Sequence, residues 1–270
     1  SSADQATPQK PRAGLTRSWA TPRAIAALIL REMSTRYGRS PGGYVWAVLE
    51  PLGSVLILGI GLSLLVRTPS LGTNFFLFYA TGFLPFTLYQ NLALYIGRCI
   101  NFSRPLLKYP AVTWVDAMLA RLILNSLTSI LVTYILLAGI LALAETNVVL
   151  DLPPMIVAIG LAILLGWGVG ALNCALIGLI EAWDVIWSIF TRPLFLASGV
   201  IFIYEDMPTG LQNILWYNPI MHVVGYMRMG FYPMYNPNYL SPVYTIGFGL
   251  ICLAFGMLLL GRYHRDILNK

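Results

Sequence analysis

The chain has 270 residues, of which 57% are apolar and 10% are charged, and its formal net charge is +6. Because soluble domains carry about 25% charged residues, this composition excludes a water-soluble globular protein and predicts an integral membrane protein. Seven of the 17 basic residues lie within the first 39 positions, a bias typical of an orientation signal at a membrane face. We therefore expect no nucleic-acid partner.

The N-terminal 38 residues divide into two parts. Residues 1–21 are rich in Ser, Ala, Pro and Arg without periodicity, and no apolar stretch with a cleavage site follows, so we expect a flexible cytoplasmic tail rather than a signal peptide. Residues 22–38 predict a helix whose apolar residues share one face, namely Ile25, Leu28, Ile29 and Met33. Its four charges make it a poor spanning segment, so the pattern favours an amphipathic helix in the membrane interface.

Six apolar segments follow, and each supplies the roughly 20 residues that about 30 Å of hydrocarbon requires. They lie near residues 44–66, 74–98, 113–143, 153–180, 185–204 and 242–261. The sequence shows no alternating pattern typical of a membrane β-barrel, so we expect all six spans to be helices. The predicted fold class is therefore an all-α, polytopic membrane protein.

The distribution of Lys and Arg predicts the orientation of the chain. With the N-terminus in the cytoplasm, 13 of the 17 basic residues fall on the cytoplasmic side. Arg67 and Arg228 fall outside, and Arg121 and Arg192 lie within or near spans. Both termini are therefore expected in the cytoplasm.

Residues 205–241, between the fifth and sixth spans, are too apolar for an ordinary loop. Two apolar pieces, near 209–217 and 219–232, are too short to span a membrane. Such backbone is tolerated at membrane depth where it lines a cavity, so we expect a re-entrant outer hairpin. Its aromatic residues fit either a belt at headgroup level or a gate that stacks on a ligand. They include Trp216, Tyr217, Tyr226, Phe231 and Tyr232.

Motifs of common hydrolytic and metal sites are missing from the sequence. None of the lysines, Lys10, Lys108 and Lys270, is followed by Ser or Thr, so no P-loop is present. The sequence has no H-E-x-x-H motif, and its three cysteines have no C-x-x-C spacing. We expect no catalytic residue, no metal site and no cofactor in this chain.

Charged residues within spans carry functional weight, because burial in hydrocarbon is costly. Arg192 either faces a conduit and attracts an anionic substrate or forms an ion pair, and Arg121 is expected to form an ion pair rather than to contact substrate. The candidate ion-pair partners are Asp184 and Glu181 for Arg192, and Asp116 and Glu50 for Arg121.

Residues 101–110 form a cytoplasmic loop in which Pro105 and Pro110 bracket one or two turns. Exposed apolar residues beside basic ones are typical of a docking surface for a soluble partner. The alternative is a short interfacial turn whose leucines enter the lipid. The residues of this predicted surface are Arg104, Pro105, Leu106, Leu107, Lys108 and Tyr109.

Several of these segments together resemble the membrane subunits of ABC-2 type polysaccharide exporters, and the likeness covers all but the tail. An interfacial helix ends in REMSTRYGRS at 31–40 and leads into GYVWAVLEP at 43–51. The stretches SGVIFIY at 198–204, WYNPI at 216–220 and GYMR at 225–228 are similar to the capsular-polysaccharide branch. Teichoic-acid and O-antigen exporters share the general plan.

The resemblance implies that residues 22–270 form an ABC-2 type transmembrane domain. It implies a homodimer of six-helix subunits with two cytoplasmic ATPase subunits, which hold ATP and Mg²⁺. Residues 101–110 then form a coupling helix seated in the ATPase, and residues 207–233 form a periplasmic gate. The implied substrate is a lipid-linked acidic polysaccharide, which crosses the bacterial inner membrane between the two subunits toward periplasmic and outer-membrane export components.

Physical chemistry suggests which residues meet such a substrate. Sugar rings stack on Trp and Tyr, and basic residues at the cytoplasmic mouth attract anionic polymer or phospholipid. For the N-terminal arginines, the orientation signal alone is the alternative, and Trp46 is either an interface anchor or a stacking residue. The residues expected at the channel or its entrance are Arg31, Arg36, Tyr37, Arg39, Trp46, Trp183, Trp187 and Arg192.

Other functions remain open on the sequence alone. An ABC-2 exporter of O-antigen, teichoic acid, a small lipid or a drug has the same architecture. An ion-coupled carrier works without an ATPase, but usually shows more intramembrane acids and an internal repeat. A membrane-embedded enzyme acting on lipid-linked sugars requires a carboxylate or His cluster, which the sequence does not display.

Overall fold

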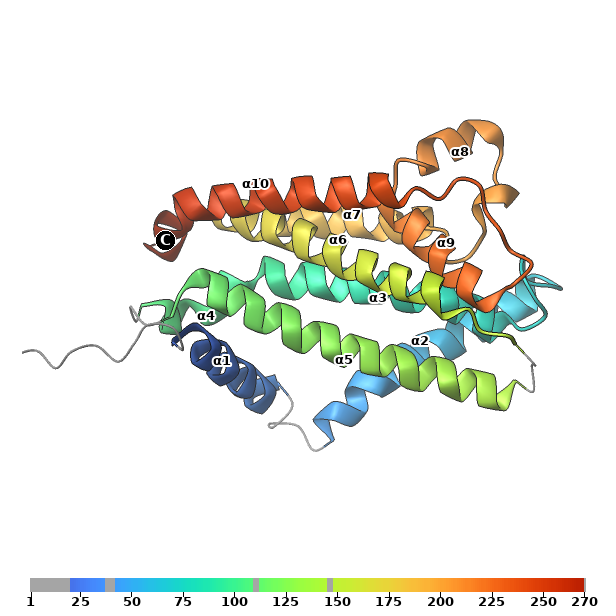
Figure 1. Cartoon of the computed structure of the whole chain (residues 1–270), viewed down its shortest axis with the longest axis horizontal. Coiled ribbons are helices and arrows are strands. Elements are labelled where there is room, and N and C mark those ends of the chain that lie inside the picture. Colours follow the sequence, from blue (N-terminus) through green and yellow to red (C-terminus); the bar gives the residue numbers. More distant parts are fainter. Residues whose placement is uncertain (1–19, 37–41, 109–111, 145–147, 270) are drawn as a thin grey trace, which may run out of the picture.

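The computed structural model describes residues 20–36, 42–108, 112–144 and 148–269. Within these ranges every regular element is helical and no strand is present, in agreement with the predicted all-α fold. Figure 1 shows long helices side by side, with α1 and α4 toward one end and α8 at the other. The elements are α1 (Ala20–Arg36), α2 (Gly43–Leu65), α3 (Phe75–Gly97), α4 (Cys99–Leu107), α5 (Trp114–Leu143), α6 (Leu152–Leu179), α7 (Trp183–Ala197), the 3₁₀ helix η2 (Tyr204–Asp206), α8 (Thr209–Leu215), α9 (Pro219–Phe231) and α10 (Pro242–Asn269).

Helix α3 lies at the centre of the bundle and packs against α2, α5, α6 and α9. The side chain of Asn74 starts the helix by accepting hydrogen bonds from the backbone N–H groups of Phe76 and Leu77. Apolar residues along most of α3 are then buried, including Leu92 and Ile96. The remaining polar side of α3 is therefore free to line cavities.

Glycines let α6 approach its two neighbours closely. A Cβ atom on Gly170 would lie 2.8 Å from the Cβ atom of Ile96 in α3, and one on Gly168 would collide with the carbonyl oxygen of Gly249 in α10. Such close backbone approach is typical of helix packing in membranes, where lipid supplies no hydrophobic driving force between helices. It fixes α6 between α3 and α10.

Four helices of the described ranges, α2, α5, α6 and α10, are long and apolar enough to cross a membrane. They match four of the six predicted spans. The other two, 74–98 and 185–204, overlap α3 and α7, but α7 ends at Ala197, seven residues before the predicted end of that span. Helix α7 has only 15 residues, and α3 carries Gln90 and Asn91 among its apolar residues. Because protein rather than lipid surrounds most of α3, it needs less apolar surface, and the six-span count stays a prediction.

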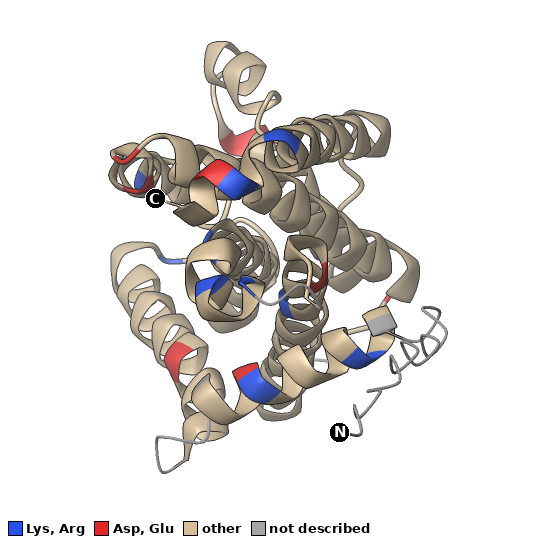
Figure 2. Cartoon of the chain, turned by 90° about the vertical axis from the view of Figure 1, so that its left-hand side faces the viewer, with Lys and Arg blue, Asp and Glu red and all other residues tan. Residues whose placement is uncertain are grey.

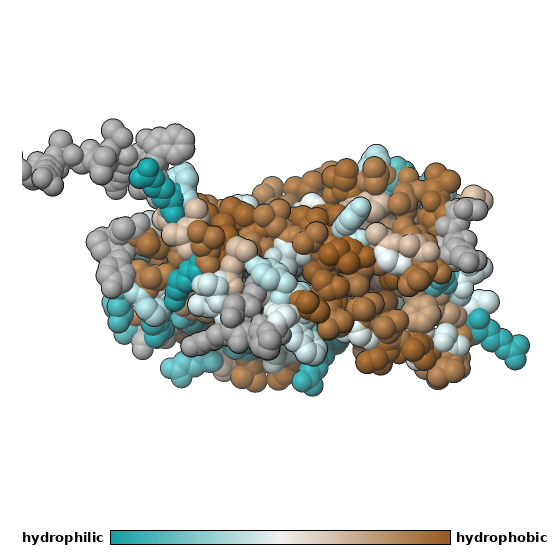
Figure 3. Space-filling model, turned by 90° about the horizontal axis from the view of Figure 1, so that it is seen from below, coloured by the Kyte–Doolittle hydropathy of each residue, from teal (hydrophilic) through white to brown (hydrophobic). Residues whose placement is uncertain are grey.

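The ends and sides of the bundle differ in polarity. Figure 3 shows apolar residues over much of the long face seen from below. Figure 2 views the end that holds α1 and α4, and Lys and Arg residues mark several helices there. Apolar sides and charged ends are typical of a membrane protein.

Helix α1 packs across the start of α5. Leu28 is buried against Ala117 and Ala120, with Ile25 and Ile29 beside it. The face predicted to be apolar is therefore the packed face, although protein covers much of it. Its position in the membrane interface stays a prediction.

The segment 205–241 contains η2, α8 and α9 and then continues without a regular helix. The side chain of Asn218 accepts a hydrogen bond from the backbone N–H of Ile220 and so starts α9 at the predicted break. Helix α9 is buried along most of its length and packs against α6 and α3. The two helices match the two predicted apolar pieces, whereas their re-entrant placement stays a prediction.

Candidate functional site

Three cavities border the polar side of α3. The polar cavity, of about 150 Å³, lies between α2, α3 and α5. A second cavity, of about 420 Å³, lies between α3 and α7 and is called the α3–α7 cavity. The entry cavity, of about 470 Å³, is lined by α1, α3, α4 and α5, by Ile177 of α6 and by Asp184 of α7. It shares Tyr95 with the polar cavity and shares Leu94, Arg98 and Asp184 with the α3–α7 cavity, so it borders both.

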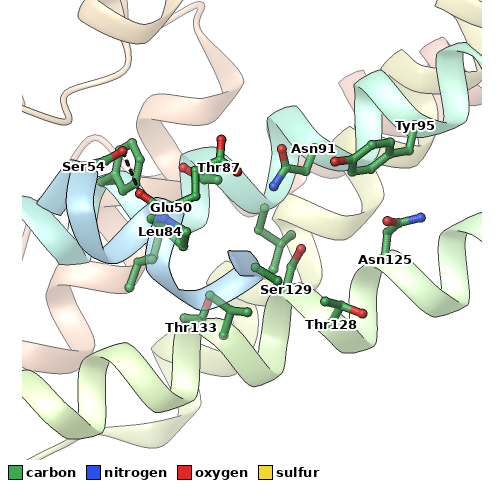
Figure 4. Close-up of a pocket in the computed structure, with 15 residues that line it drawn as sticks. Glu50, Ser54, Leu84, Thr87, Asn91, Tyr95, Asn125, Thr128, Ser129 and Thr133 are labelled. Atoms are coloured by element: carbon green, nitrogen blue, oxygen red, sulfur yellow. Dashed lines mark hydrogen bonds between the residues drawn. The ribbon is translucent and has the colours of Figure 1, made fainter. Parts of the chain in front are cut away.

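The polar cavity is lined by a carboxylate, hydroxyls and amides from three helices, as Figure 4 shows. On each helix these residues recur every four positions and so share one face. They are Glu50 and Ser54 on α2, Thr87, Asn91 and Tyr95 on α3, and Asn125, Ser129 and Thr133 on α5. This site was not predicted from the sequence, although the polar stripe within apolar segments is a signal that could have indicated it. Such a lining suits water or a hydroxyl-rich ligand, because polar groups in an apolar region need hydrogen-bond partners.

The α3–α7 cavity contains two of the predicted channel residues, Trp187 and Arg192. Its wall combines aromatic rings with polar and charged groups. The main contributors are Tyr89, Gln90 and Arg98 from α3, and Asp184, Trp187, Ser188, Thr191, Arg192 and Phe195 from α7. Aromatic faces and hydrogen-bonding groups together form the usual setting for a sugar ring, and the two arginines favour a sugar that carries negative charge.

Asp184 forms an ion pair with Arg98 and not with Arg192, so the predicted Arg192–Asp184 pair is wrong. Nη2 of Arg98 lies 2.8 Å from Oδ2 of Asp184, and about half of each side chain is exposed. Arg98 ends α3 and Asp184 begins α7, which brings the two residues together at the border between the entry and α3–α7 cavities. Arg192 forms no ion pair within the described ranges, which leaves its charge available inside the α3–α7 cavity.

Arg121 pairs with Glu32 of α1, so its predicted pairing with Asp116 or Glu50 is also wrong. Nε of Arg121 lies 3.3 Å from Oε2 of Glu32, and both side chains are buried. Nη1 of Arg121 also donates to the carbonyl oxygen of Tyr95. Asp116 is occupied elsewhere, because its carboxylate accepts hydrogen bonds from the backbone and side chain of Thr113 at the start of α5. The Glu32–Arg121 pair therefore ties α1 to α5 at the wall of the entry cavity.

The other predicted entrance residues are dispersed. The guanidinium carbon of Arg31 lies 5.5 Å from the centre of the Phe102 ring, near the entry cavity. Trp183 donates from Nε1 to the side chain of Asn173 in α6 and so has a structural role. Trp46 is 60% exposed on α2 and lines none of the three cavities. The side chain of Arg36, together with Tyr37 and Arg39, lies outside the described residues.

The predicted docking loop 101–110 is largely the helix α4, but its leucines are not exposed. Leu106 and Leu107 are partly buried and pack on the cluster around Leu28, where they fill the space between α1 and α5. Arg104 donates from Nη2 to the carbonyl oxygen of Ile267 in α10. The exposed residues of this stretch are instead Asn101, Phe102, Pro105 and Lys108, while Tyr109 lies outside the described residues.

The predicted gate aromatics do not form one cluster. Trp216 and Tyr217 are in contact, with ring centres 5.5 Å apart, and Trp216 also packs against Tyr244 of α10. Phe231 is buried in the main core. Tyr232 packs against that core and against a smaller cluster around Phe78, and Tyr226 packs on the main core. Only Trp216 and Tyr217 therefore remain together as candidates for a shared outer surface.

Hydrogen bonds join loop 232–241 to η2 and to the end of α8. The hydroxyl of Tyr235 donates to Oε2 of Glu205 at 3.0 Å. Burial raises the pKa of Tyr235 well above its usual value, so the phenol stays protonated and remains the donor. Trp216 donates from Nε1 to the carbonyl oxygen of Tyr239. These bonds hold loop 232–241 against the end of the bundle that holds α8.

Comparison with known proteins gives a consistent result. The sequence profile of the family described as ABC-2 type transporter matches residues 23–232. The chain is 27% identical over 235 residues to the polysialic acid transport protein KpsM of Escherichia coli, covering 87% of this chain and 91% of that protein. It is 25% identical over 245 residues to the capsule polysaccharide export inner-membrane protein CtrC of Neisseria meningitidis serogroup B, covering 91% and 92%. It is 23% identical over 246 residues to the capsule polysaccharide export inner-membrane protein BexB of Haemophilus influenzae, again covering 91% and 92%.

Proposed function

The chain belongs to the ABC-2 type transporter family, and from this membership we propose that it is the inner-membrane subunit that exports a capsular polysaccharide. The named relatives from three bacteria are capsule or polysialic acid export proteins, and the similarity to each covers at least 87% of this chain. As a transporter subunit without a P-loop, the chain leaves ATP hydrolysis to a separate subunit.

The α3–α7 cavity supports this proposal, because it contains side chains suited to contact a sugar polymer. Trp187 offers a ring face to a sugar, Ser188 directly after it offers a hydroxyl, and Thr191 offers another one turn further along α7. Arg192 adds a charge without an ion-pair partner in the described ranges. A long acidic glycan can move past such groups because none of them forms a deep pocket.

A second copy of the chain completes the conduit in this proposal. Helix α7 has no buried residue, and α2 has only two, Val55 and Gly59. Apolar side chains such as Ile57 and Ile189 remain exposed on these helices. We propose that the homodimer covers these faces, that six helices of each copy cross the membrane, and that lipid-linked glycan passes between the copies.

The proposed orientation places the basic end of the bundle in the cytoplasm. The end that holds α1 and α4 carries many of the Lys and Arg residues (Figure 2), which the positive-inside rule assigns to the cytoplasm. The opposite end, with α8, α9 and loop 232–241, then faces the periplasm as the outer gate. Both chain termini lie in the cytoplasm, and any periplasmic or outer-membrane export components meet the opposite end.

Helix α4 is the proposed contact with the ATPase, which holds ATP and Mg²⁺. Phe102, Pro105 and Lys108 are exposed on it, whereas its leucines anchor it to α1 and α5. A cavity of about 420 Å³ beside it is lined by Lys108, His264 and Arg265 among others. An anchored helix with an exposed, basic surface can transmit movement from an acidic partner surface into the bundle.

The test measures capsular glycan in cells that lack this chain. We expect glycan to accumulate inside the cells and to be absent from the surface. Reintroducing the unaltered chain should return glycan to the surface and remove the accumulation. The double variant Trp187→Ala/Arg192→Gln should restore export poorly, whereas Leu258→Ala, at an exposed position of α10, should restore it fully. Normal surface glycan in the absence of the chain would overturn the proposal and favour another substrate of the same transporter family.

A further inference from the structure

We propose that Arg98 and Asp184 form a carboxylate-exchange gate between the entry cavity and the α3–α7 cavity. A carboxylate of an acidic sugar replaces Asp184 as the partner of Arg98 when the glycan enters the α3–α7 cavity. The inference rests on the proposed function, because it names the residues that recognise the acidic polymer at that site.

The geometry of the pair leaves Arg98 able to bind a second carboxylate. Nη2 of Arg98 donates to both carboxylate oxygens of Asp184, at 3.0 Å to Oδ1 and 2.8 Å to Oδ2. Within the described residues, Nε and Nη1 of Arg98 donate no hydrogen bond. Guanidinium groups bind carboxylates best through two parallel N–H bonds. The two edges of a guanidinium that offer parallel N–H bonds, Nη1 with Nη2 and Nε with Nη2, both include Nη2. An incoming carboxylate can therefore make a first bond at Nη1 or Nε, and it gains the second bond only as Asp184 leaves Nη2.

Exposure makes this pair exchangeable. The side chains of Arg98 and Asp184 are 50% and 42% exposed, whereas those of Arg121 and Glu32 are only 6% and 7% exposed. An exposed ion pair adds little to stability, whereas a buried pair is costly to break. Of the two ion pairs within the described ranges, only Arg98–Asp184 can therefore open at low cost.

The Arg98–Asp184 pair lies at the border between the two cavities. Arg98 and Asp184 line both the entry cavity and the α3–α7 cavity, so a glycan that passes from one to the other meets them. Arg192 lies eight residues beyond Asp184 on the same helix and lines the same α3–α7 cavity, about 12 Å further along the helix axis. Asp184 is the only acidic residue that lines this cavity within the described ranges. A carboxylate released by Arg98 therefore finds its next cationic partner at Arg192.

The exchange predicts selectivity for charge. A neutral sugar has no group that can displace Asp184, whereas a carboxylate competes with it directly for the guanidinium. Asp184 therefore acts as a built-in competitor that keeps the α3–α7 cavity closed to neutral chains. Its removal should raise the affinity for an acidic oligomer, which is an effect opposite to that of ordinary structural damage.

The experiment uses the full chain in lipid nanodiscs and two matched probes. These are an oligomer of galacturonic acid and the same oligomer with its carboxylates methyl-esterified, and binding is followed by tryptophan fluorescence. We expect the unaltered chain to bind the acid about tenfold more tightly than the ester, in line with one charge-assisted contact. Arg98→Gln should abolish this preference, Arg98→Lys should keep part of it, and Asp184→Asn should tighten binding of the acid severalfold. Asp266→Asn, an exposed carboxylate near the C-terminus, is the matched control and should change nothing.

The possible results separate the two proposals. If the unaltered chain prefers the acid but Asp184→Asn leaves its affinity unchanged or lowers it, the exchange gate is wrong while the acidic-glycan function stands. The same holds if Arg98→Gln keeps the full preference. If the unaltered chain binds the acid no better than the ester, the gate fails together with the acidic-substrate part of the proposed function.

Discussion

The guanidinium carbon of Arg228 lies 4.2 Å from the centre of the Phe78 ring, so a buried cation of α9 packs on the ring of a residue in α3. Nη1 of Arg228 donates to the carbonyl oxygens of Gly199 and Phe202, and Nη2 donates to that of Val200. Burial lowers the pKa of Arg228 to about 10, so the group stays charged at neutral pH. One side chain thus joins α3, α9 and the segment that follows α7.

Arg228→Met should destabilise the protein by at least about 3 kcal/mol, because several buried carbonyl groups lose their donor at about 1–3 kcal/mol each. Thermal unfolding in detergent should show a lower Tm than for the unaltered chain. Arg262→Met is the control, since Arg262 is exposed, and it should change the Tm little. Equal Tm values for Arg228→Met and the unaltered chain would show that the carbonyl contacts of Arg228 contribute nothing to stability.

Two glycines of α6 provide a matched test of close helix packing. A Cβ atom on Gly168 would collide with the carbonyl oxygen of Gly249 in α10, whereas one on Gly160 would meet nothing within 4 Å. Gly168→Ala should therefore cost about 1–3 kcal/mol through overpacking. Gly160→Ala should be neutral or stabilising by up to about 1 kcal/mol, because alanine favours the helix. Unfolding of both variants under the same conditions measures the contrast, and equal stabilities would contradict the packing argument.

The sequence predicted the elements of the fold well because they depend on local patterns. Apolar runs located the helices, and the interruption between the apolar pieces 209–217 and 219–232 marked the break before α9. These features depend on residues within a few turns of one another. A single sequence is sufficient to detect them.

Long-range partners were not predictable in the same way. Asp184 pairs with Arg98, 86 positions earlier in the chain, and nothing near either residue indicates the other. Arg98 is one of the 13 basic residues that the orientation count assigned to the cytoplasmic side, and that assignment gave no indication of its position at a cavity border. Leu106 and Leu107 belong to a short amphipathic helix, and only the packing of α1 shows that protein rather than solvent or lipid meets them. Pairing of this kind depends on how the helices pack, which local periodicity does not specify.

The buried pair of Glu32 and Arg121 should respond strongly to loss of one partner. Glu32→Gln leaves a buried cation without its carboxylate and should cost about 3–5 kcal/mol. The double variant Glu32→Gln/Arg121→Gln should cost less than the sum of the two single substitutions, because it leaves no unpaired charge. A double-mutant cycle of unfolding free energies measures this coupling. Strict additivity of the two substitutions would contradict it.

The half-exposed ion pair of Arg98 and Asp184 provides the comparison for the buried pair of Glu32 and Arg121. Arg98→Gln should change the unfolding free energy by about 0–1 kcal/mol, because Arg98 and Asp184 are solvated. A cost as large as that of Glu32→Gln would show that exposure does not separate the two pairs. This measurement also checks that the binding variants of Arg98 are folded.

His222 should make the outer end of the bundle sensitive to acid. Its Nδ1 accepts a hydrogen bond from the backbone N–H of Ser241, and its Nε2 lies 2.9 Å from the carbonyl oxygen of Trp216, so the ring is neutral with its proton on Nε2. Burial lowers the pKa of His222 below its usual 6.5. The unfolded state then binds the proton more readily, so stability that is present above about pH 6.5 is lost as the pH falls below that value.

Measurements of Tm from neutral pH down to about pH 5 test this dependence. The Tm should begin to fall near pH 6.5, the usual pKa of histidine in an unfolded chain, and should fall further below it. His222→Gln should lower the Tm at neutral pH and reduce its pH dependence. His264→Gln is the control, because the hydrogen bonds of His264 within the described part of the chain go to carbonyl oxygens of its own helix. An unchanged pH dependence in His222→Gln would assign the acid effect to other groups.

The exposed basic residues beside α4 should govern contact with the ATPase. Lys108 and Arg265 line one cavity at this end of the bundle, and Lys108→Glu/Arg265→Glu places two negative charges where we expect an acidic partner surface. Co-purification with the ATPase should fall, and binding by the unaltered chain should weaken as salt rises, because exposed charges are screened. Arg67→Glu, at an exposed position just after α2, is the matched control and should leave the complex intact. Retention of the ATPase by the double variant at low salt would exclude this basic surface as its docking site.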